Sequence, residues 1–330
     1  MPGPGSRAAS RVTDALNIRP APDGRRLFLD GLVDYAGLFP PANLDMAASV
    51  AEYRQARNAA TGWIIDRFIV PASRLNELAA ELTSTMKAGE PPWDISVILD
   101  TGGEPWVDSI SSDVTTATAF ARELAPAVRF TMAEAKVPID LLAADDPAHQ
   151  VGEAATSVAR LGAMPMFELP PAGDLRSLVG ALVDARQSRQ VVLGAKLRCG
   201  GLAAQDFPSP QQVADFITVC GEFDVPFKAT AGLHHPFRYE NPDDGFTHHG
   251  FVNIVTAAVM ASTLDEPLLV ELISDQDGAN FEVAPSGLSW RGHSVSAEAV
   301  ATGRAGSITS YGSCSVAEPL EDLAAMGVLP

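Results

Sequence analysis

Cysteine is scarce in this sequence, which holds 3 cysteines among 330 residues. Cys199, Cys220 and Cys314 form an odd set with no C-x-x-C spacing, which argues against a disulfide framework and against a cysteine zinc cluster. We therefore expect three reduced thiols.

Long apolar runs are absent as well. No run approaches the roughly 20 residues that a membrane-spanning helix needs, so we expect no membrane partner. Residues 1–26 are rich in Pro, Gly, Ala and Arg and lack the apolar segment of a signal peptide. We predict a disordered leader over 1–26 and a cytoplasmic protein.

Positive charge is also in short supply, since 23 Lys and Arg residues stand against 41 Asp and Glu residues and the net charge is −18. Binding to a phosphate backbone depends on Lys and Arg displacing counterions, so this balance argues against a nucleic-acid partner. Hydrophobic residues make up 46% of the chain and charged residues 19%, which is ordinary for a soluble globular protein and too apolar for a disordered one.

Short β-rich runs alternate with amphipathic helical patterns along most of the chain. The first run, 63–71, is followed by a helical pattern over 73–86, and the same alternation recurs to the end. The predicted strands, in chain order, are 63–71, 93–100, 127–138, 164–171, 190–201, the start of 225–239, 267–275 and 307–315.

Eight strands, each followed by a helix, predict a (β/α)₈ TIM barrel. A doubly wound open sheet is the alternative, because alternation alone does not show closure. Residues 30–58 are expected to form an N-terminal helical extension, and 280–295 a hairpin-like insertion. No low-complexity linker separates the units, so we predict one barrel domain over 27–330.

Ionisable side chains gather near the ends of four consecutive predicted strands. Strand side chains alternate between barrel interior and helix layer, and barrel enzymes build their sites at the carboxyl ends of strands. Parity places six of these side chains inside the barrel mouth: Glu134, Lys136, Glu168, Lys196, Arg198 and Lys228. Stability alone explains buried charges poorly, although a paired charge network or a one-residue register shift would also account for them.

A lysine inside a barrel has a specific chemical use. Desolvation and neighbouring cations favour the neutral amine, which can attack a carbonyl carbon and form a Schiff base. Lys228, with Lys196 and Arg198 on the adjacent strand, is the predicted nucleophile. Glu168 or Glu134 would move protons, and Thr230 would orient a water or a substrate hydroxyl.

The segment KATAG, residues 228–232, is similar to the K-T-S-T-G segment around the Schiff-base lysine of deoxyribose-phosphate aldolase. A lysine on the sixth strand of a (β/α)₈ barrel also resembles the class I aldolases, and the resemblance implies that Lys228 is the Schiff-base residue. The predicted seventh strand has no counterpart of that family's second lysine, so Lys196 would take over its pKa-lowering role.

The chain as a whole resembles a group of bacterial barrel proteins that carry the segments VDYAGLFPP, KLRCGG, FKATAGLHHP and YGSCS. This second resemblance implies no particular activity.

Four of the six histidines, at 234, 235, 248 and 249, follow the sixth predicted strand. Imidazoles are common transition-metal ligands, so a divalent metal such as zinc, held by Glu168, His234 and His249, is the alternative to a site without metal or cofactor. H-x-H and H-E-x-x-H spacings are missing, and His234 acting as proton donor or substrate partner is equally consistent with the sequence.

The eighth predicted strand ends in Gly312, Ser313, Cys314 and Ser315, before a helical pattern in which Ser315 and Glu318 have capping-box spacing. Barrels often bind phosphate or carboxylate there through backbone N–H groups and the helix dipole. A simple N-cap turn is the other interpretation. No signature favours Cys314 as a nucleophile over a buried thiol.

Three functions remain open. The first is a lyase of aldolase type that acts on a small anionic carbonyl metabolite through Lys228, Glu168 and Lys196. The second is a metal-dependent lyase, isomerase or hydrolase. The third is a non-catalytic barrel that binds an anionic metabolite. A homo-oligomer is compatible with each.

Overall fold

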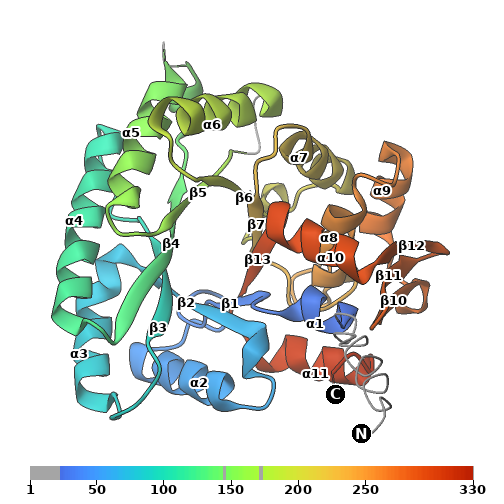
Figure 1. Cartoon of the computed structure of the whole chain (residues 1–330), viewed down its shortest axis with the longest axis horizontal. Coiled ribbons are helices and arrows are strands. Elements are labelled where there is room, and N and C mark those ends of the chain that lie inside the picture. The colour runs from blue at the N-terminus through green and yellow to red at the C-terminus, as the bar shows by residue number, and fades with distance from the viewer. Residues whose placement is uncertain (1–22, 144–145, 171–173, 330) are drawn as a thin grey trace, which may run out of the picture.

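The computed structural model describes residues 23–143, 146–170 and 174–329. Eight parallel strands close into a barrel that helices surround (Figure 1). Around the barrel these strands are β1 (Val33–Tyr35), β2 (Ile65–Pro71), β3 (Trp93–Ile98), β4 (Val128–Lys136), β5 (Met164–Glu168), β6 (Gly194–Arg198), β7 (Phe227–Thr230) and β13 (Ile308–Ser313). The predicted (β/α)₈ barrel is confirmed, and the open-sheet alternative is wrong.

One helix follows each barrel strand in the outer layer. These helices are α2 (Met46–Asn58), α3 (Leu75–Thr85), α4 (Trp106–Leu124), α5 (Pro147–Ala159), α6 (Leu175–Arg189), α7 (Pro210–Glu222), α8 (Phe251–Met260) and α11 (Ala317–Ala325). Side-chain caps determine where several of them begin. The Asp45 carboxylate accepts from Ala48 N at the start of α2, and Ser209 and Gln212 form a capping box at α7.

Short 3₁₀ helices lie within several of the connections. They cover Gly62–Ile64, Ala72–Arg74, Ile139–Ala143, Ala204–Asp206 and Gly278–Asn280.

Two predicted elements differ from the structure. Residues 33–35, inside the segment expected to be helical, form the first barrel strand. The predicted seventh strand over 267–275 is instead the helix α9 (Glu266–Ser274), whose N-cap Asp265 accepts from Leu268 N. An apolar run of this length fits either element, and the Asp-Glu-Pro start of the segment decides for a helix.

One strand is gained and one predicted strand is lost, so the barrel still has eight strands, but most of them hold a different position in the strand order. Because β1 comes first, Lys196 lies on the sixth barrel strand and Lys228 on the seventh. The sixth-strand lysine on which the aldolase resemblance rested is therefore Lys196. The expectation that strand seven lacks a lysine is also wrong.

Apolar packing lies between the barrel and the helices. On β7, Phe227 and Ala229 are buried on the outer side, and Phe227 meets Phe216 of α7 edge-on with ring centroids 5.3 Å apart. On the opposite side of the barrel Tyr53 of α2 packs on Trp93 of β3 at 4.8 Å. Lys228, between Phe227 and Ala229, is left to point into the barrel, as parity predicts.

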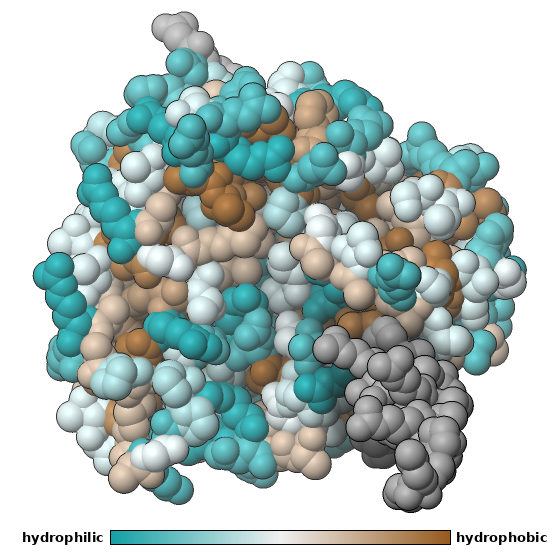
Figure 2. All heavy atoms as spheres, viewed as in Figure 1, coloured by the Kyte–Doolittle hydropathy of each residue, from teal (hydrophilic) through white to brown (hydrophobic). Residues whose placement is uncertain are grey.

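The face seen in Figure 2 is mostly hydrophilic, with hydrophobic residues visible in small patches between the helices. Among the described residues the large apolar side chains that are clearly exposed are Ile139, Val192 and Leu202. Buried apolar residues from Phe28 to Val328 form one continuous cluster.

The chain between β7 and β13 adds elements outside the barrel. After α8 and α9 come a three-stranded antiparallel sheet of β10 (Phe281–Ala284), β11 (Gly287–Trp290) and β12 (His293–Ser296), then α10 (Ala297–Gly306). The predicted hairpin-like insertion is thus confirmed. The first described helix, α1 (Gly24–Leu29), packs against α10 and β10.

The predicted leader falls largely outside the described residues, since 1–22 are not among them. Residues 24–26 belong to α1, so the leader prediction is wrong for these three positions. Of the helices that the structure describes, none combines the length and the apolar character needed to cross a bilayer.

The side chain of Asn253 in α8 connects the long loop after β7 to the helix layer through hydrogen bonds. This loop contains the small hairpin β8 (Tyr239–Glu240) and β9 (Thr247–His248). Asn253 Oδ1 accepts from Arg238 N at 3.0 Å, and Nδ2 donates to Leu272 O at 2.8 Å and Asp275 O at 2.9 Å. The side chain is fully buried, so it holds the loop, α8 and the end of α9 together.

Replacing Asn253 by alanine is expected to lower the free energy of unfolding by about 2–4 kcal/mol, because three backbone groups lose their buried partner. Urea denaturation followed by circular dichroism measures this change. Asn58→Ala is the matched control, since Asn58 is exposed and its amide donates only to Arg54 O. If N253A destabilises the protein no more than N58A does, the anchoring role is refuted.

Candidate active site

A row of charged side chains runs through the barrel interior. Salt bridges join four cations and four carboxylates, in alternation, into one ion-pair chain. From the carboxyl end of the barrel to the amino end it consists of Arg198, Glu168, Lys196, Glu134, Lys228, Asp34, Arg67 and Asp66.

Glu134 of β4 lies at the centre of the ion-pair chain and is only 1% exposed. Its Oε1 accepts from Lys228 Nζ at 2.7 Å and from Ser96 Oγ at 2.6 Å, and its Oε2 lies 2.8 Å from Lys196 Nζ. The two lysines are register partners on β6 and β7. Neighbouring strands therefore present both ammonium groups to one carboxylate.

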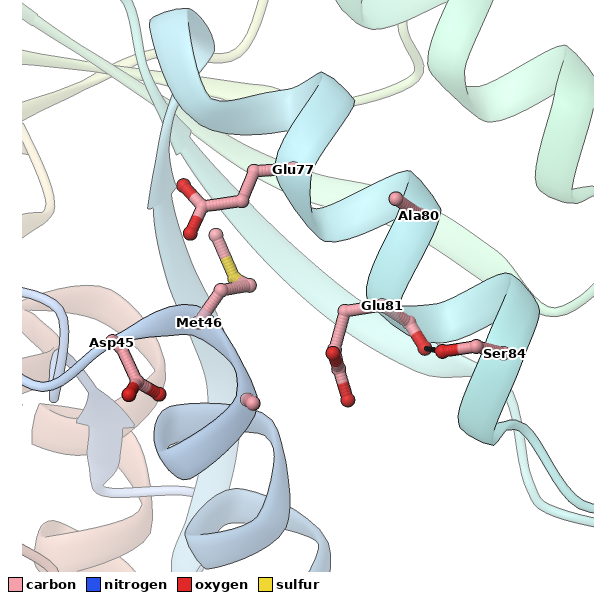
Figure 3. A pocket seen from close by; sticks show the side chains of 7 residues that line it. Asp45, Met46, Glu77, Ala80, Glu81 and Ser84 are labelled. Atoms are coloured by element: carbon pink, nitrogen blue, oxygen red, sulfur yellow. Dashed lines mark hydrogen bonds between the residues drawn. The ribbon is translucent and has the colours of Figure 1, made fainter.

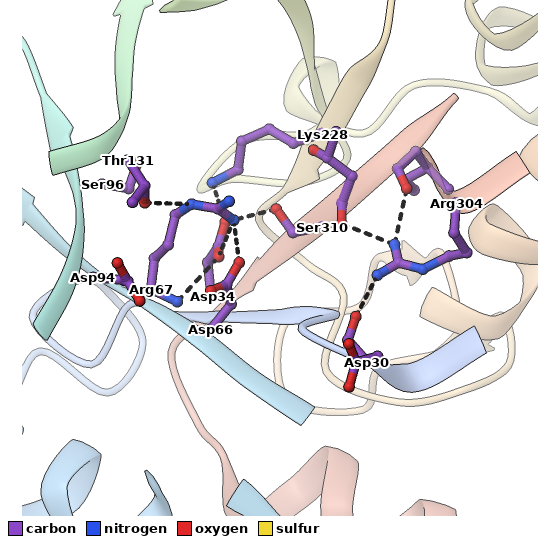
Figure 4. Close-up of polar contacts among 12 residues, drawn as sticks. Asp30, Asp34, Asp66, Arg67, Asp94, Ser96, Thr131, Lys228, Arg304 and Ser310 are labelled. Carbon is purple, nitrogen blue, oxygen red and sulfur yellow. Dashed lines mark hydrogen bonds and ion pairs between the residues drawn. The ribbon is translucent and has the colours of Figure 1, made fainter. Parts of the chain in front are cut away.

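Lys228 is the deeper of the two lysines and is fully buried. Its Nζ donates to Asp34 Oδ2 at 2.6 Å, and the same carboxylate oxygen accepts from Ser310 Oγ at 2.7 Å (Figure 4). Asp34 comes from β1 and is also fully buried, so strands β1, β4, β7 and β13 all contribute to the surroundings of this ammonium.

Lys196 lies nearer to the barrel mouth, and its side chain is 7% exposed. Its Nζ is 3.0 Å from Glu168 Oε2, and Glu168 Oε1 accepts from Arg198 Nε at 3.0 Å. The Arg198 side chain is 44% exposed, and its Nη1 donates to Gly200 O at 3.1 Å. Exposure thus rises from Lys228 through Lys196 to Arg198, so Arg198 is the most accessible of these three side chains.

The other end of the ion-pair chain reaches the amino end of the barrel. Arg67 Nη1 lies 3.1 Å from Asp34 Oδ1 and 2.6 Å from Asp66 Oδ2, and Arg67 Nε donates to Thr131 Oγ1 at 3.0 Å. The Asp66 side chain is 29% exposed. Charged contacts are therefore continuous from one end of the barrel to the other.

The carboxyl groups of the interior are held ionised. Burial by itself raises the pKa of Glu134, but the ammonium groups of Lys196 and Lys228 outweigh it and hold that pKa well below its usual range. For Asp34, burial is likewise outweighed by Lys228 and by Arg67, so the pKa of Asp34 is lowered.

Lys196 is held charged. Burial alone lowers the pKa of its ammonium, but Glu134 and Glu168 outweigh burial and raise that pKa. Glu168 shows the converse, because burial is outweighed by Lys196 and Arg198 and its pKa is lowered. The sequence predicts Lys196 as a neighbouring cation that favours the neutral amine at Lys228. In the structure each of the two ammonium groups instead lies within 3.0 Å of two carboxylates.

Thr230, Gly312 and Lys136 all lie at the carboxyl ends of their strands. Thr230 and Gly312 are register partners, and a Cβ on Gly312 would lie 3.2 Å from Thr230 Oγ1 and 3.3 Å from Ile69 Cδ1. The backbone at Gly312 thus lies close to these two side chains, and glycine fits this approach without a clash. Lys136, the register partner of Glu168, is the last residue of β4 and is exposed at the rim, so the prediction that it lies inside the mouth is wrong.

The strand that carries Lys228 ends in a tight turn with positive φ at Ala231 (63°) and Gly232 (70°). A Cβ on Gly232 would lie 3.2 Å from Cys199 O and 3.2 Å from Gly200 Cα, so the loops after β6 and β7 are in backbone contact. A non-glycine residue such as Ala231 is strained in this conformation, a feature that often accompanies functional sites.

Ser313 and Ser315 shape the turn before α11. Ser313 Oγ donates to Ser315 O at 2.6 Å, and Glu318 N donates to Ser315 Oγ at 3.2 Å. The N-cap of α11 is Val316, which makes no side-chain cap hydrogen bond, so Ser315 shapes the turn just before the helix without being its N-cap. Anion binding there stays a prediction.

His234 lies beside this turn. Its Nδ1 is 3.0 Å from Glu318 Oε2 and 3.9 Å from Cys314 Sγ. Both contacts use one nitrogen, so the ring does not link thiol to carboxylate through its two nitrogens, as a nucleophile–base–acid triad does. Burial raises the pKa of the Cys314 thiol, and it raises that of Cys199 to about 12. Both thiols therefore stay protonated at neutral pH.

The three predicted metal ligands have separate partners. Glu168 is paired with Lys196 and Arg198, while His234 faces Glu318. His249 Nδ1 lies 3.1 Å from Arg238 Nη1, and His249 Nε2 lies 2.7 Å from Pro208 O. Burial lowers the pKa of His249 to about 4. Across 23–143, 146–170 and 174–329, no three His, Cys, Asp or Glu side chains are grouped as metal ligands. A metal requirement stays a prediction.

Two open pockets lie outside the mouth. One, of about 430 Å³, lies between α2 and α3 in the helix layer and is lined by Asp45, Met46, Glu77, Glu81 and Ser84 among others (Figure 3). It contains no member of the ion-pair chain. The other, of about 440 Å³, lies at the amino end of the barrel and includes Asp66.

Sequence reasoning missed Asp34, Arg67, Ser96 and Ser310. Asp34 was hidden because its three-residue strand was expected to be helical. The other three follow the same inward parity as the predicted interior residues, so counting parity on the first, second and eighth predicted strands would have found them.

The ring of eight parallel strands with charged side chains inside places this protein in the class of (β/α)₈ barrels. The chain is similar to a tetrameric deoxyribose-phosphate aldolase from Aeropyrum pernix, with 12% identity, a TM-score of 0.49 and coverage of 92% of this chain and 98% of that chain. It is also similar to a xylose isomerase-like TIM barrel protein from Mycobacterium smegmatis in complex with magnesium, with 12% identity, a TM-score of 0.40 and coverage of 75% and 98%. No model of a protein family matches the chain, and no curated protein sequence does. These likenesses concern the fold alone.

Glu134→Gln is expected to lower the free energy of unfolding at pH 7 by about 3–5 kcal/mol, because two buried ammonium groups lose the carboxylate they share. The folded-state pKa of Glu134 lies below its unfolded value, so its contribution is full above about pH 5 and is lost as the pH falls. The difference in the free energy of unfolding between E134Q and the wild-type protein, measured by urea denaturation, should therefore shrink as the pH falls from about 5 to about 2.

The matched control is Glu77→Gln, which removes the exposed pair with Arg74 and should cost less than about 1 kcal/mol. If E134Q loses as much unfolding free energy at pH 3 as at pH 7, the loss does not come from the charge of Glu134.

Proposed function

We propose that the protein is an enzyme that forms an imine between a barrel lysine and a small anionic carbonyl substrate, as class I aldolases and related lyases do. The observation that carries this proposal is the pair Lys196 and Lys228, side by side in the interior and sharing Glu134. The chain has only four lysines, and two of them are here. Buried ion pairs stabilise a fold less than apolar residues of similar size, so a chemical role accounts for them better.

Accessibility favours Lys196 over Lys228 as the nucleophile. Lys228 is fully buried between Asp34 and Glu134, whereas Lys196 lies beside the half-exposed Arg198. The strand order points the same way, because Lys196 occupies the sixth-strand position of the class I aldolases and Lys228 supplies the second lysine on strand seven. The local likeness of KATAG to the aldolase segment favours Lys228 instead, so the two lysines have to be tested separately.

Arg198 links an anionic substrate group to activation of the lysine. In the barrel as described, Arg198 Nε engages Glu168, and this contact helps to keep Glu168 ionised and unprotonated. An anionic group that binds the exposed guanidinium competes with Glu168 for it. Glu168 then becomes more basic and can take a proton from Lys196 Nζ, which lies 3.0 Å away. Substrate binding itself would thus generate the neutral amine.

The proposed steps balance protons. Glu168 accepts one proton from Lys196, and the neutral amine attacks the carbonyl carbon to give a carbinolamine. Glu168 returns the proton when water leaves, so that one ammonium and one carbonyl yield one protonated imine and one water.

The protonated imine then accepts the electron pair of the breaking carbon–carbon bond and becomes an enamine, while a hydroxyl on the departing carbon gives its proton to Glu168 and becomes a carbonyl. Glu168 passes that proton to the enamine carbon, and one water hydrolyses the resulting imine, which releases the second carbonyl product and restores the Lys196 ammonium. Thr230 and His234 are the proposed hydrogen-bond partners of the hydroxyl on the departing carbon.

Borohydride trapping tests the proposal. The protein is incubated with small aldehydes and keto acids that carry a carboxylate or a phosphate, then reduced, and the adduct is located by peptide mass spectrometry. The expected adduct is on Lys196, with formation reduced at least 100-fold in Lys196→Met. Lys228→Met should form the same adduct more slowly, because Lys228 orients Glu134 without touching the carbonyl.

Lys87→Met is the matched control, since Lys87 is exposed and lies outside the barrel. An adduct confined to Lys228 would reverse the assignment of the nucleophile. Labelling of Lys87 and Lys136 alone, across the whole panel, would refute imine chemistry.

A further inference from the structure

The amino end of the ion-pair chain opens to solvent, on the side away from the mouth. Asp66 is the second residue of β2 and lines the pocket of about 440 Å³ there, together with Asp30, Gly31, Arg304 and Thr309. This pocket lies at the opposite end of the barrel from Arg198. Its link to the candidate active site runs through the interior contacts of the ion-pair chain alone.

One nitrogen atom joins Asp66 to the interior. Arg67 Nη1 is 2.6 Å from Asp66 Oδ2 and 3.1 Å from Asp34 Oδ1, so the two carboxylates share it (Figure 4). Asp34 Oδ2 in turn accepts from Lys228 Nζ. A change of charge on Asp66 therefore alters how strongly Arg67 is drawn to Asp34, and with it the field at both lysines.

Asp66 can change its charge near neutral pH. Burial, then the neighbouring charge of Asp34, raise the pKa of Asp66 to about 6, against the lowering effect of Arg67. The charged groups that face it come from every element around it: Asp34 on β1, Asp94 on β3, Arg129 on β4, Lys228 on β7, Arg304 on α10 and Asp30 before β1.

We propose that Asp66 regulates the imine-forming site from the far end of the barrel, by supplying or withdrawing the last negative charge of the ion-pair chain. With Asp66 ionised the chain is balanced, four cations against four carboxylates. With Asp66 neutral the chain carries one excess positive charge, which disfavours the ammonium form of Lys196. Neutral Asp66 therefore makes Lys196 easier to deprotonate, and ionised Asp66 makes it harder.

The test is a pH titration of the interior lysines by NMR, with lysine labelled by ¹³C and ¹⁵N. Four lysines keep the spectrum simple, and Lys87→Met and Lys136→Met assign the two exposed ones. The interior signals should show a step with its midpoint near pH 6. That step should vanish in Asp66→Asn and persist in Asp94→Asn, a matched carboxylate at the same end of the barrel that pairs with Arg129.

An unchanged step in D66N would overturn the proposal, and so would the absence of any step in the wild-type protein. The wild-type titration keeps the proposal falsifiable even if D66N fails to fold. If Asp66 had only a structural role, its replacement would change the stability of the protein, but the NMR signals of the interior lysines would show no step near pH 6.

A second readout rests on the proposed function. At pH 7.5 the rate of imine trapping at Lys196 should rise about 3- to 10-fold in D66N, as expected for one charge removed at this depth. A rate in D66N at or below that of D94N would contradict regulation by Asp66. If the wild-type protein forms no adduct, the proposed function fails, whereas the NMR titration still decides whether Asp66 is coupled to the lysines.

Discussion

An ammonium group that leaves water for the inside of a closed barrel has to be matched by carboxylates, and Lys196 and Lys228 impose this requirement on the whole interior. Glu134 serves both lysines, Glu168 serves one and Asp34 the other. These carboxylates then need cations of their own, which Arg198 and Arg67 supply at the two ends. The alternating ion-pair chain follows from two buried lysines.

The same constraint gives the ion-pair chain a buried centre and two ends that solvent reaches. Burial is complete at Asp34 and Lys228 and falls toward the mouth, where Arg198 is half exposed. Solvent therefore reaches the ion-pair chain at Arg198, where we propose that the substrate competes with Glu168. Solvent reaches it again at Asp66. The proposed chemistry at the mouth and the proposed control at Asp66 would both act through the same ion-pair chain.

Sequence patterns were sufficient for the parts of the fold that repeat. Alternation of strands and helices gave the barrel, and parity placed Glu134, Glu168, Lys196 and Lys228 inside, because side chains on a strand point to opposite faces in turn. Patterns failed where an element is short or ambiguous. The strand β1 has three residues, too few to show a period, and α9 has an apolar run that fits a strand or a helix.

These failures decided which site residues were found. With β1 missing, Asp34 stayed hidden and the strands β2 to β7 were each numbered one too low, so the sixth-strand position was assigned to Lys228 although Lys196 occupies it. The charge state of the lysines could not be predicted from the sequence for a different reason, because it depends on distances between side chains across the barrel. Parity shows that Lys196 points inward, but it cannot show that Glu134 and Glu168 lie within 3.0 Å of its nitrogen.

We propose that the charged interior serves chemistry and contributes little to the stability of the fold. The double variant Glu168→Leu/Lys196→Met tests it most directly, because it removes one opposite-charge pair and leaves Glu134 paired with Lys228. We expect its free energy of unfolding, measured by urea denaturation, to equal or exceed that of the wild-type protein. A loss of more than about 3 kcal/mol would show that the ion-pair chain is mainly a structural element.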